Sequence, residues 1–288
     1  MMSRQSCGFN VENVDIEESL SRVAAVIGEE PRLVVTRSGQ PWVGLTTDCA
    51  VHIAYDERTR NRIKEEAARL QWAARQGIPV PRVRESGPDW LVTERAVNDG
   101  VTSGRRYVEA AVAAARAINR ATEPPPSVRG PLPRHGGGYW SGLVRLSRIV
   151  RSPLSPLEFR QARKAAAALP PGGLAHGDFV LHNILFDASR GTVTVIDWEF
   201  LRYAPAHFDL LVLWPRLAAA EDREIVMEAV LSTTQDRRAV GVLHHWLSVR
   251  LLADLVTKTP PRAWARERVD EAVRRVAEAR SNAAAWGA

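Results

Sequence analysis

A stretch near the middle of the chain concentrates polar side chains that could do chemistry. Residues 175–200 read AHGDFVLHNILFDASRGTVTVIDWEF. The apolar runs NILFD and TVTVID are typical of β-strands, and the DASRG segment between them ends in glycine, so the stretch predicts a β-hairpin. Strand pairing would then place Asn183, at the start of the first strand, beside Asp197, at the end of the second. Because Asp178 lies in the loop just upstream, three oxygen-bearing side chains are expected at one end of the hairpin.

Asp178, Asn183 and Asp197 are side chains of the types that phosphoryl transfer requires. Aspartate and asparagine oxygens at neighbouring strand ends suit a hard cation such as Mg²⁺, which takes one or two protein ligands together with phosphate oxygens. An aspartate five residues before Asn183 could accept a proton from an attacking hydroxyl group. Phosphoryl transfer depends on this kind of positioning and electrostatic stabilisation. The sequence therefore predicts a metal-dependent phosphoryl-transfer site.

Two other interpretations of the same stretch remain open. A metal hydrolase would use His176, Asp178 and His182 as ligands, but His176 and Asp178 alone do not make a tetrahedral ligand set, and the sequence has no second cluster of His and Asp. Alternatively, the polar residues have no function beyond capping the end of a hairpin.

The composition narrows the classes of partner. The chain has 288 residues, of which 45% are hydrophobic and 25% charged, as is ordinary for a globular protein. Its formal net charge of +6 could indicate nucleic-acid binding. However, the arginines alternate with acids, as in DERTRNRIKEEAARL at 56–70, which is typical of a solvated helix face. We therefore expect no nucleic-acid partner.

The sequence also predicts no membrane partner. It has no run of 18 or more apolar residues, and its first 18 residues lack the apolar segment of a secretory signal. Two cysteines, Cys7 and Cys49, cannot build a disulfide framework. We expect a cytoplasmic protein.

Hydrophobic periodicity divides the chain into a small β-rich part with helical segments and a larger, mostly helical part around the hairpin. A Pro/Gly-rich loop is expected at 123–140. The predicted fold class is α+β. The other expected elements are helices over 11–28, 56–77 and 104–122, strands within 32–54 and over 89–96, and mostly helix beyond 204.

The polar residues of the hairpin also form a recognisable motif. His176, Gly177, Asp178 and Asn183 match the pattern H-G-D-x-x-x-x-N, and Asp197 follows fourteen residues after Asn183 in an I-D-W-E stretch. The pattern resembles that of the aminoglycoside phosphotransferase and choline kinase family, a relative of the protein kinases.

This resemblance implies a two-lobed, protein-kinase-like fold. Residues 1–97 would form a small β-rich lobe that clamps the nucleotide. Residues 98–288 would form a larger helical lobe with the catalytic loop and the acceptor site. ATP would be the phosphoryl donor, Mg²⁺ its metal cofactor, and a hydroxyl group of a small metabolite or antibiotic the acceptor.

The resemblance also implies roles for single residues of the larger part. Asp178 would be the catalytic base or would orient the hydroxyl group. Asn183 and Asp197 would hold Mg²⁺ on the nucleotide phosphates, and His176 would support the loop. The segment APAHFDLLVLW matches the turn and helix of the family, so Asp209 would be a buried brace that hydrogen-bonds the catalytic loop.

Further matches lie on either side of this region. Glu66 lies where the family places its helix glutamate. Backbone groups from Glu94 to Ala96 would meet the edge of the adenine ring. Glu199 would either reach a second metal ion or have a solvated or structural role.

Two departures from the family pattern concern the phosphates of the nucleotide. The family's A-x-K pattern, whose lysine clamps the α and β phosphates, is replaced here by Ala50-Val51-His52. His52 would be a weaker, pH-dependent clamp or would merely pack, since an unperturbed histidine is mostly neutral at pH 7. The turn TRSGQPWVG at 36–44 also lacks a dense glycine cluster.

These departures keep open a catalytically weak or silent nucleotide-binding protein. A kinase that acts on a peptide hydroxyl is a separate alternative. The charge balance of the helical segment beyond residue 241 is net positive, which weakens the case for a polycationic aminoglycoside as acceptor.

Overall fold

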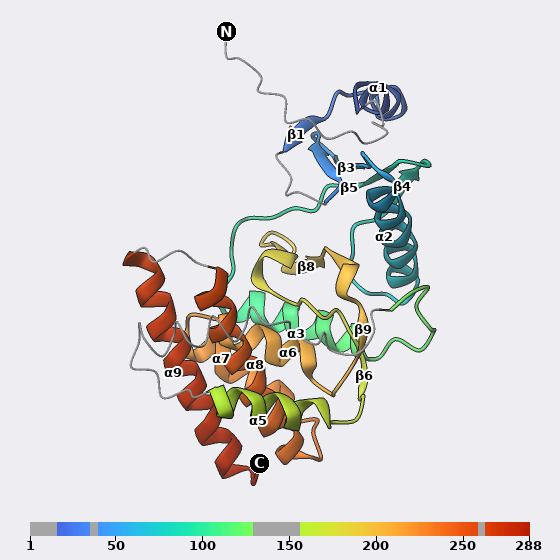
Figure 1. The fold of residues 1–288 in the computed structure, drawn as a ribbon. Helices are drawn as coiled ribbons and strands as arrows, with labels where there is room; N and C mark the ends of the chain where they lie inside the picture. The colour runs from blue at the N-terminus through green and yellow to red at the C-terminus, as the bar shows by residue number, and fades with distance from the viewer. Residues whose placement is uncertain (1–15, 35–39, 129–155, 259–262) are drawn as a thin grey trace. The chain divides into compact units, whose positions relative to one another are not determined.

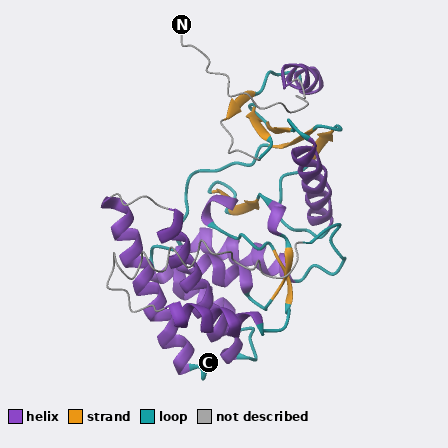
Figure 2. Cartoon of the chain, in the orientation of Figure 1, coloured by secondary structure: helices purple, strands orange, loops and turns teal. Residues whose placement is uncertain are grey.

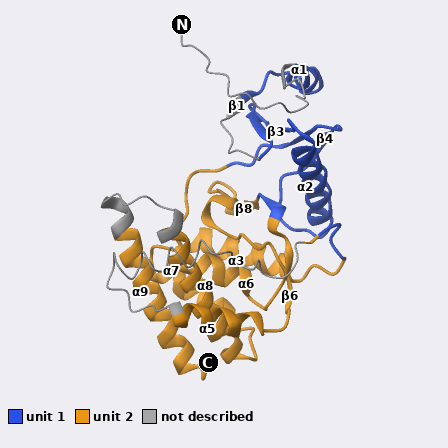
Figure 3. Cartoon of the chain, in the orientation of Figure 1, with its two compact units in different colours: residues 1–97, 124–127, 196–199 blue, residues 98–123, 128–195, 200–288 orange. Residues whose placement is uncertain are grey.

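The computed structural model describes residues 16–34, 40–128, 156–258 and 263–288 (Figure 1). The chain forms two compact units (Figure 3). Unit 1 contains residues 1–97, 124–127 and 196–199, and unit 2 contains residues 98–123, 128–195 and 200–288. Figure 2 shows that helices make up most of unit 2.

Unit 1 is built on a five-stranded antiparallel sheet with the strand order β1-β2-β3-β5-β4. Burial alternates along β3 as the pleat of a strand requires: Cys49, Val51 and Ile53 are buried, whereas Ala50 and His52 are only partly covered. The buried face of β3 packs with Val23 of α1. The elements are α1 (Ile16–Ile27), β1 (Arg32–Val34), β2 (Trp42–Leu45), β3 (Cys49–Ile53), α2 (Glu57–Arg75), β4 (Val83–Ser86) and β5 (Trp90–Glu94).

The ends of α2 follow from local sequence signals. Asp56 is the N-cap: its carboxylate accepts a hydrogen bond of 2.7 Å from the backbone N–H of Thr59, and the Thr59 hydroxyl accepts one of 3.0 Å from the N–H of Asp56. This capping box satisfies two backbone donors at the start of the helix. After the helix, Gly77 adopts a φ of +70°, a conformation that favours glycine. The helix predicted over 56–77 is confirmed.

Two segments from later in the chain complete unit 1. The Trp198 ring is fully buried and meets the Trp72 ring edge-on, with 6.4 Å between the ring centroids. The Ser127 hydroxyl accepts hydrogen bonds from the Nε and Nη2 atoms of Arg69, at 3.1 and 2.8 Å. Arg69 is itself buried, so these bonds, together with its ion pair to Glu65, satisfy a guanidinium that has lost water.

Unit 2 is mainly helical and has two small antiparallel ladders, β6 with β9 and β7 with β8. Helix α8 contacts both α9 and α5, and α3 contacts α7 (Figure 1). The elements are α3 (Arg105–Asn119), α5 (Pro156–Ala167), β6 (Gly173–Ala175), β7 (Ile184–Asp187), β8 (Thr192–Val195), β9 (Arg202–Ala204), α6 (Phe208–Leu213), α7 (Ala220–Leu231), α8 (Arg237–Lys258) and α9 (Ala263–Ala285), with 3₁₀ turns at Leu181–Asn183, Trp198–Phe200 and Trp214–Arg216. The turn Trp198–Phe200 divides between the two units.

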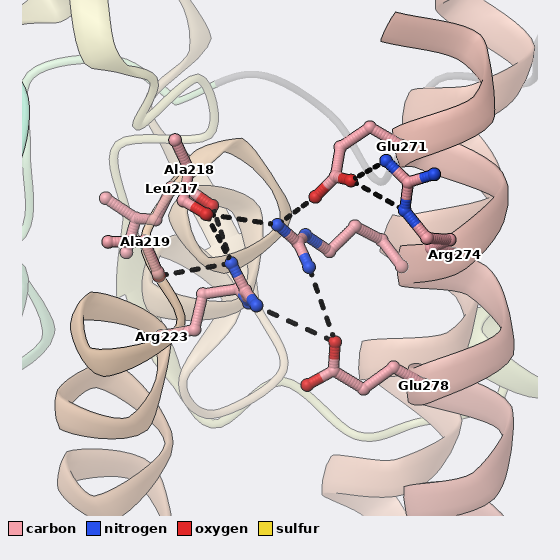
Figure 4. A network of polar contacts seen from close by, with 8 residues as sticks. Leu217, Ala218, Ala219, Arg223, Glu271, Arg274 and Glu278 are labelled. Atoms are coloured by element: carbon pink, nitrogen blue, oxygen red, sulfur yellow. Dashed lines mark hydrogen bonds and ion pairs between the residues drawn. The ribbon is translucent and has the colours of Figure 1, made fainter. Parts of the chain in front are cut away.

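A network of charged groups holds α9 to the turn before α7 (Figure 4). The Nη1 atom of Arg223 donates to the three carbonyl groups of residues 217–219, at 3.1, 2.8 and 3.1 Å. Arg275 forms ion pairs with Glu271 and, at 3.6 Å, with Glu278. Two acidic residues of the C-terminal segment are therefore engaged in structural ion pairs.

Some expectations lie outside the described residues. Most of the predicted Pro/Gly-rich loop falls in 129–155, and part of the turn at 36–44 falls in 35–39. The helix predicted over 104–122 is present as α3. Within the described part of the chain, no helix is long and apolar enough to cross a bilayer.

Candidate active site

The loop between β6 and β7 carries the predicted catalytic residue and is held by a buried carboxylate. The backbone N–H groups of His176 and Gly177 donate to the two oxygens of Asp209, at 2.7 and 3.0 Å. Asp209 lies in α6, 5% exposed. The predicted role of Asp209 as a brace of this loop is confirmed, and it fixes the backbone directly before Asp178.

The environment of Asp209 balances opposing effects on its charge. Burial raises the pKa of the Asp209 carboxyl group to about 7, and the negative charge of Asp178 acts in the same direction. The hydrogen bonds from Gly177 and His176 and the positive charge of Arg202 act against this rise. Arg202 is buried, and its Nε donates to the carbonyl oxygen of Phe200 at 3.0 Å.

At Gly177 the loop passes close to the segment of Phe200 and Arg202. Its φ is +85°, in the left-handed region that favours glycine. A Cβ atom at this position would overlap the carbonyl oxygen of Phe200 and lie 3.0 Å from the Nε of Arg202. The loop can therefore adopt this path only with glycine before Asp178.

Asp178 and Asn183 are brought together in unit 2. The Nδ2 group of Asn183 donates to the carbonyl oxygen of Asp178 at 3.0 Å and to its carboxylate at 3.3 Å. Asn183 is 2% exposed, and its own carbonyl oxygen accepts no hydrogen bond from the described residues. The amide thus turns its nitrogen to the loop and keeps an oxygen for another ligand, while Asp178 stays partly exposed. An amide oxygen of this kind is a suitable ligand for Mg²⁺.

The predicted hairpin is present, but its register is offset by one residue from the predicted pairing of Asn183 with Asp197. Ile184 pairs with Val195 at one end of the ladder, and Gly191 closes the turn at the other with a φ of +67°. Asn183 directly precedes β7 and Asp197 follows β8 by two residues, so these chain positions belong to the same end of the ladder. Asp197 has a φ of +64°, an unusual conformation for a residue other than glycine and one that often occurs at functional sites.

Within unit 1, Asp197 lies close to the helix glutamate. Glu66 accepts a hydrogen bond of 3.5 Å from the backbone N–H of Trp198. Burial and the negative charge of Asp197 raise the pKa of Glu66 to about 7, while Arg69 opposes the rise. A cation near two such carboxyl groups would relieve their repulsion. The side chains present therefore fit a divalent metal ion at Asp197.

His52 lies on the less buried face of β3, together with Ala50, as strand alternation predicted. Burial lowers the pKa of His52 to about 4, so the imidazole is neutral at pH 7 in the ligand-free protein. The charges that act most strongly on Glu66 are those of Asp197, Arg69 and Glu199. Because its imidazole is neutral, His52 places no positive charge at the position where the predicted clamp would need one.

The segment predicted to meet adenine follows β5. The N–H groups of Glu94 and Arg95 are already bonded to the carbonyl oxygens of Arg82 and Asp48, at 2.8 Å each. The N–H of Ala96 makes no backbone hydrogen bond to another described residue. It is therefore the first amide after β5 that remains available to a ligand.

Sequence reasoning left one alternative that the geometry disfavours and missed two arginines. His176 is fully buried and His182 is exposed, and nowhere in the described ranges do three His, Cys, Asp or Glu side chains gather as a metal set. A hydrolytic metal site made of these histidines is thus unsupported.

The two arginines that the sequence did not indicate are Arg202 and Arg62. The Nη1 atom of Arg62 lies 3.5 Å from the Glu199 carboxylate. No motif marks either arginine, because their roles depend on packing.

Comparison with known proteins shows the family to which the chain belongs. Residues 16–243 match the profile of the phosphotransferase enzyme family. An aminoglycoside 3'-phosphotransferase from Streptomyces ribosidificus is 30% identical over 190 residues, which cover 58% of this chain and 70% of that protein.

Solved structures show the same fold. A choline/ethanolamine kinase family protein from Mesorhizobium loti has a TM-score of 0.55 at 18% identity, covering 93% of this chain and 94% of that one. The streptomycin–ATP–APH(2'')-IIa ternary complex has a TM-score of 0.58 at 14% identity, covering 93% of this chain and 99% of that one. The predicted α+β, protein-kinase-like fold class is thereby confirmed.

Proposed function

Because the chain belongs to the phosphotransferase enzyme family, as its sequence motif predicted, we propose that it transfers the γ-phosphoryl group of ATP, with Mg²⁺, to a hydroxyl group of a small molecule. The observation that carries this proposal is the hydrogen-bonded pair of Asp178 and Asn183 on a loop braced by Asp209. This arrangement offers a partly exposed carboxylate beside an amide oxygen that can bind metal.

Each residue of the pair has its own task in the proposed reaction. Asp178 accepts the proton of the acceptor hydroxyl as the hydroxyl oxygen forms a bond to the γ-phosphorus; the bond from that phosphorus to the β–γ bridging oxygen breaks, and ADP leaves. The Asn183 carbonyl oxygen and the Asp197 carboxylate would hold Mg²⁺. When bound, Mg²⁺ neutralises the charge that develops on the phosphate oxygens. The Asn183 amide nitrogen keeps the Asp178 carboxylate in one orientation through its 3.3 Å hydrogen bond.

We assign the nucleotide to residues of unit 1. The Ala96 amide and neighbouring backbone groups of Glu94 bind the adenine edge. Glu66 orients the segment of Asp197 through the Trp198 N–H. His52 contacts the phosphates, and bound triphosphate raises its pKa from the low value of the free protein.

The acceptor is proposed to be a small alcohol that is not polycationic. Arg216 is among the charged groups near Asp178: burial and Arg250 lower the pKa of Arg216 to about 10, and the carboxylates of Asp178 and Asp254 oppose this shift. The support for this proposal is the net positive charge of the segment beyond residue 241, which disfavours an acceptor with several ammonium groups. We retain the prediction of a cytoplasmic protein, because ATP is the proposed donor.

The neutral state of His52 favours one alternative, a silent nucleotide-binding protein. An acceptor screen that measures ADP release, across aminoglycosides, macrolides, nucleoside antibiotics, amino alcohols and sugars, separates the two. Heat of Mg-ATP binding without ADP formation from any acceptor would support the silent protein. Labelled phosphate on a peptide instead of a small molecule would indicate a peptide kinase.

Three aspartate variants test the assignment of roles. Asp178→Asn is expected to lower turnover by about a hundredfold or more while Mg-ATP affinity stays within a few-fold of the parent. Asp197→Asn is expected to weaken Mg-dependent ATP binding in calorimetry. Asp270→Asn, on an exposed site of α9, is the matched control and should match the parent in both assays. Parental turnover in Asp178→Asn would refute its catalytic role.

A further inference from the structure

Unit 2 contains a cavity of about 410 Å³ that includes none of the proposed catalytic or metal-binding residues. Its lining comes from the C-terminal part of α3, from β6, from the start of α6 with the turn before it, and from Thr233. Helix α3 contacts both β6 and α6. Its volume is in the range that holds a small organic molecule. The polar side chains in its wall are Arg116, Asn119, Arg120, His207, Asp209 and Thr233.

The wall of this cavity presents hydrogen-bond donors and positive charge. No described carboxylate forms an ion pair with Arg116 or Arg120. The Nη2 of Arg116 is fixed by the carbonyl oxygen of Ala229 at 2.8 Å, and Arg120 is exposed. Both guanidinium groups therefore retain donors that an anion could use.

The one acidic group in the described wall is already occupied. The two carboxylate oxygens of Asp209 accept hydrogen bonds from the N–H groups of His176 and Gly177. It therefore does not neutralise the two arginines through a hydrogen bond. Asn119 donates from its side-chain amide to the Leu174 carbonyl oxygen at a long 3.3 Å, so it too can reorient toward a ligand.

His207 gives a second indication of a functional site. It has a φ of +63°, although it is neither glycine nor asparagine, and such strained residues cluster at binding and active sites. Burial and the positive charge of Arg116 lower the pKa of its imidazole. The imidazole is therefore subject to the same positive field that an anion would experience in the cavity.

We propose that this cavity binds a small organic anion, a phosphate monoester or a carboxylate, through Arg116 and Arg120. His207 and Asp209, two residues apart in the chain, both line the same cavity. Because Asp209 accepts hydrogen bonds from the amides of His176 and Gly177, a ligand in the cavity restricts the motion of the catalytic loop. Binding itself does not depend on the proposed phosphotransferase activity.

Calorimetric titration of the full chain with glycerol 3-phosphate, and separately with lactate, tests the site. Arg120→Glu should weaken binding of the preferred anion by about tenfold or more, since it replaces a charge-assisted donor by a repelling carboxylate. Arg160→Glu makes the same charge change on an exposed site of α5 outside the cavity and should stay within twofold of the parent. Arg120→Gln, which adds no repulsion, should lie between them.

Hydrogen exchange supplies a readout that does not depend on activity. The anion should slow exchange of the His176 and Gly177 amides in the parent and in Arg160→Glu, but not in Arg120→Glu. Equal affinity in Arg120→Glu and Arg160→Glu would place the anion elsewhere and overturn the proposal. Absence of binding of both anions to the parent would overturn it as well. Binding without any change in amide exchange would refute the link to the loop.

Discussion

Replacement of Gly177 by alanine is expected to destabilise unit 2 more than the same replacement at another glycine with a similar backbone. Gly177 has a φ of +85° and faces the carbonyl oxygen of Phe200. Gly100 has a φ of +72°, and no atom lies within 4 Å of the place that an added methyl group would take, so Gly100→Ala is the matched control. The two variants share the conformational cost and differ in the steric one.

The magnitudes follow from these two contributions. An alanine in the left-handed region costs about 1–2 kcal/mol relative to glycine, which is the full expectation for Gly100→Ala. At Gly177 the methyl group must also displace the Phe200 carbonyl or the Arg202 guanidinium, and such overpacking adds about 1–3 kcal/mol. Gly177→Ala is therefore expected to lower the free energy of unfolding by about 2–5 kcal/mol.

Urea denaturation measures this difference. The midpoint should fall further for Gly177→Ala than for Gly100→Ala at an unchanged m-value. Turnover should fall as well in Gly177→Ala, because the shifted backbone moves Asp178. Equal destabilisation by the two variants would show that the close approach of Gly177 to Phe200 does not constrain the loop, and would refute this reasoning.

Three more outcomes are expected. His52→Lys should bind Mg-ATP more tightly than the parent at pH 7 in calorimetry, because it replaces a neutral imidazole by a cation; a large loss of affinity would instead assign His52 a packing role. Burial raises the pKa of Asp209 to about 7 from 3.8, so the native state keeps a proton that the unfolded chain releases. The stability that this proton contributes is lost as the pH rises through 7. The unfolding free energy of the parent relative to the non-titrating Asp209→Asn should therefore fall by up to about 3 kcal/mol between pH 5 and pH 8, and a difference that does not vary with pH would contradict the raised pKa. Arg223→Met should destabilise the protein by about 2–4 kcal/mol in urea denaturation, because three carbonyl groups lose a charged donor, whereas the exposed Arg238→Met should have little effect.

The parts of the site that lie close together in sequence could be predicted. The hairpin follows from two short apolar runs and a turn that ends in Gly191, whereas its register differs by one residue from the predicted pairing of Asn183 with Asp197. The link between Asp178 and Asn183 spans five residues of one loop, so their spacing nearly determines their contact. The role of Asp209 was readable because a motif marks it, although its partners are more than 30 residues away.

Contacts between distant segments could not be predicted in this way. Glu66 and Trp198 are 132 residues apart, and nothing in either local sequence signals the hydrogen bond between them. Likewise, strand alternation predicted the face of His52, but the low pKa of its imidazole depends on how much of that face is covered. Such burial is decided by the packing of the whole unit, and hydrophobic periodicity carries no information about it.

The order of synthesis has a consequence for unit 1, because its parts leave the ribosome at very different times. The sheet, α1 and α2 all lie within the first 97 residues, but Trp198 and Ser127 emerge much later. Until then the nascent segment lacks the ring that covers Trp72 and the hydroxyl that accepts from Arg69. A fragment cut after residue 97 would consequently display an uncovered tryptophan edge to chaperones, so this lobe should be expressed and engineered only as part of the whole chain.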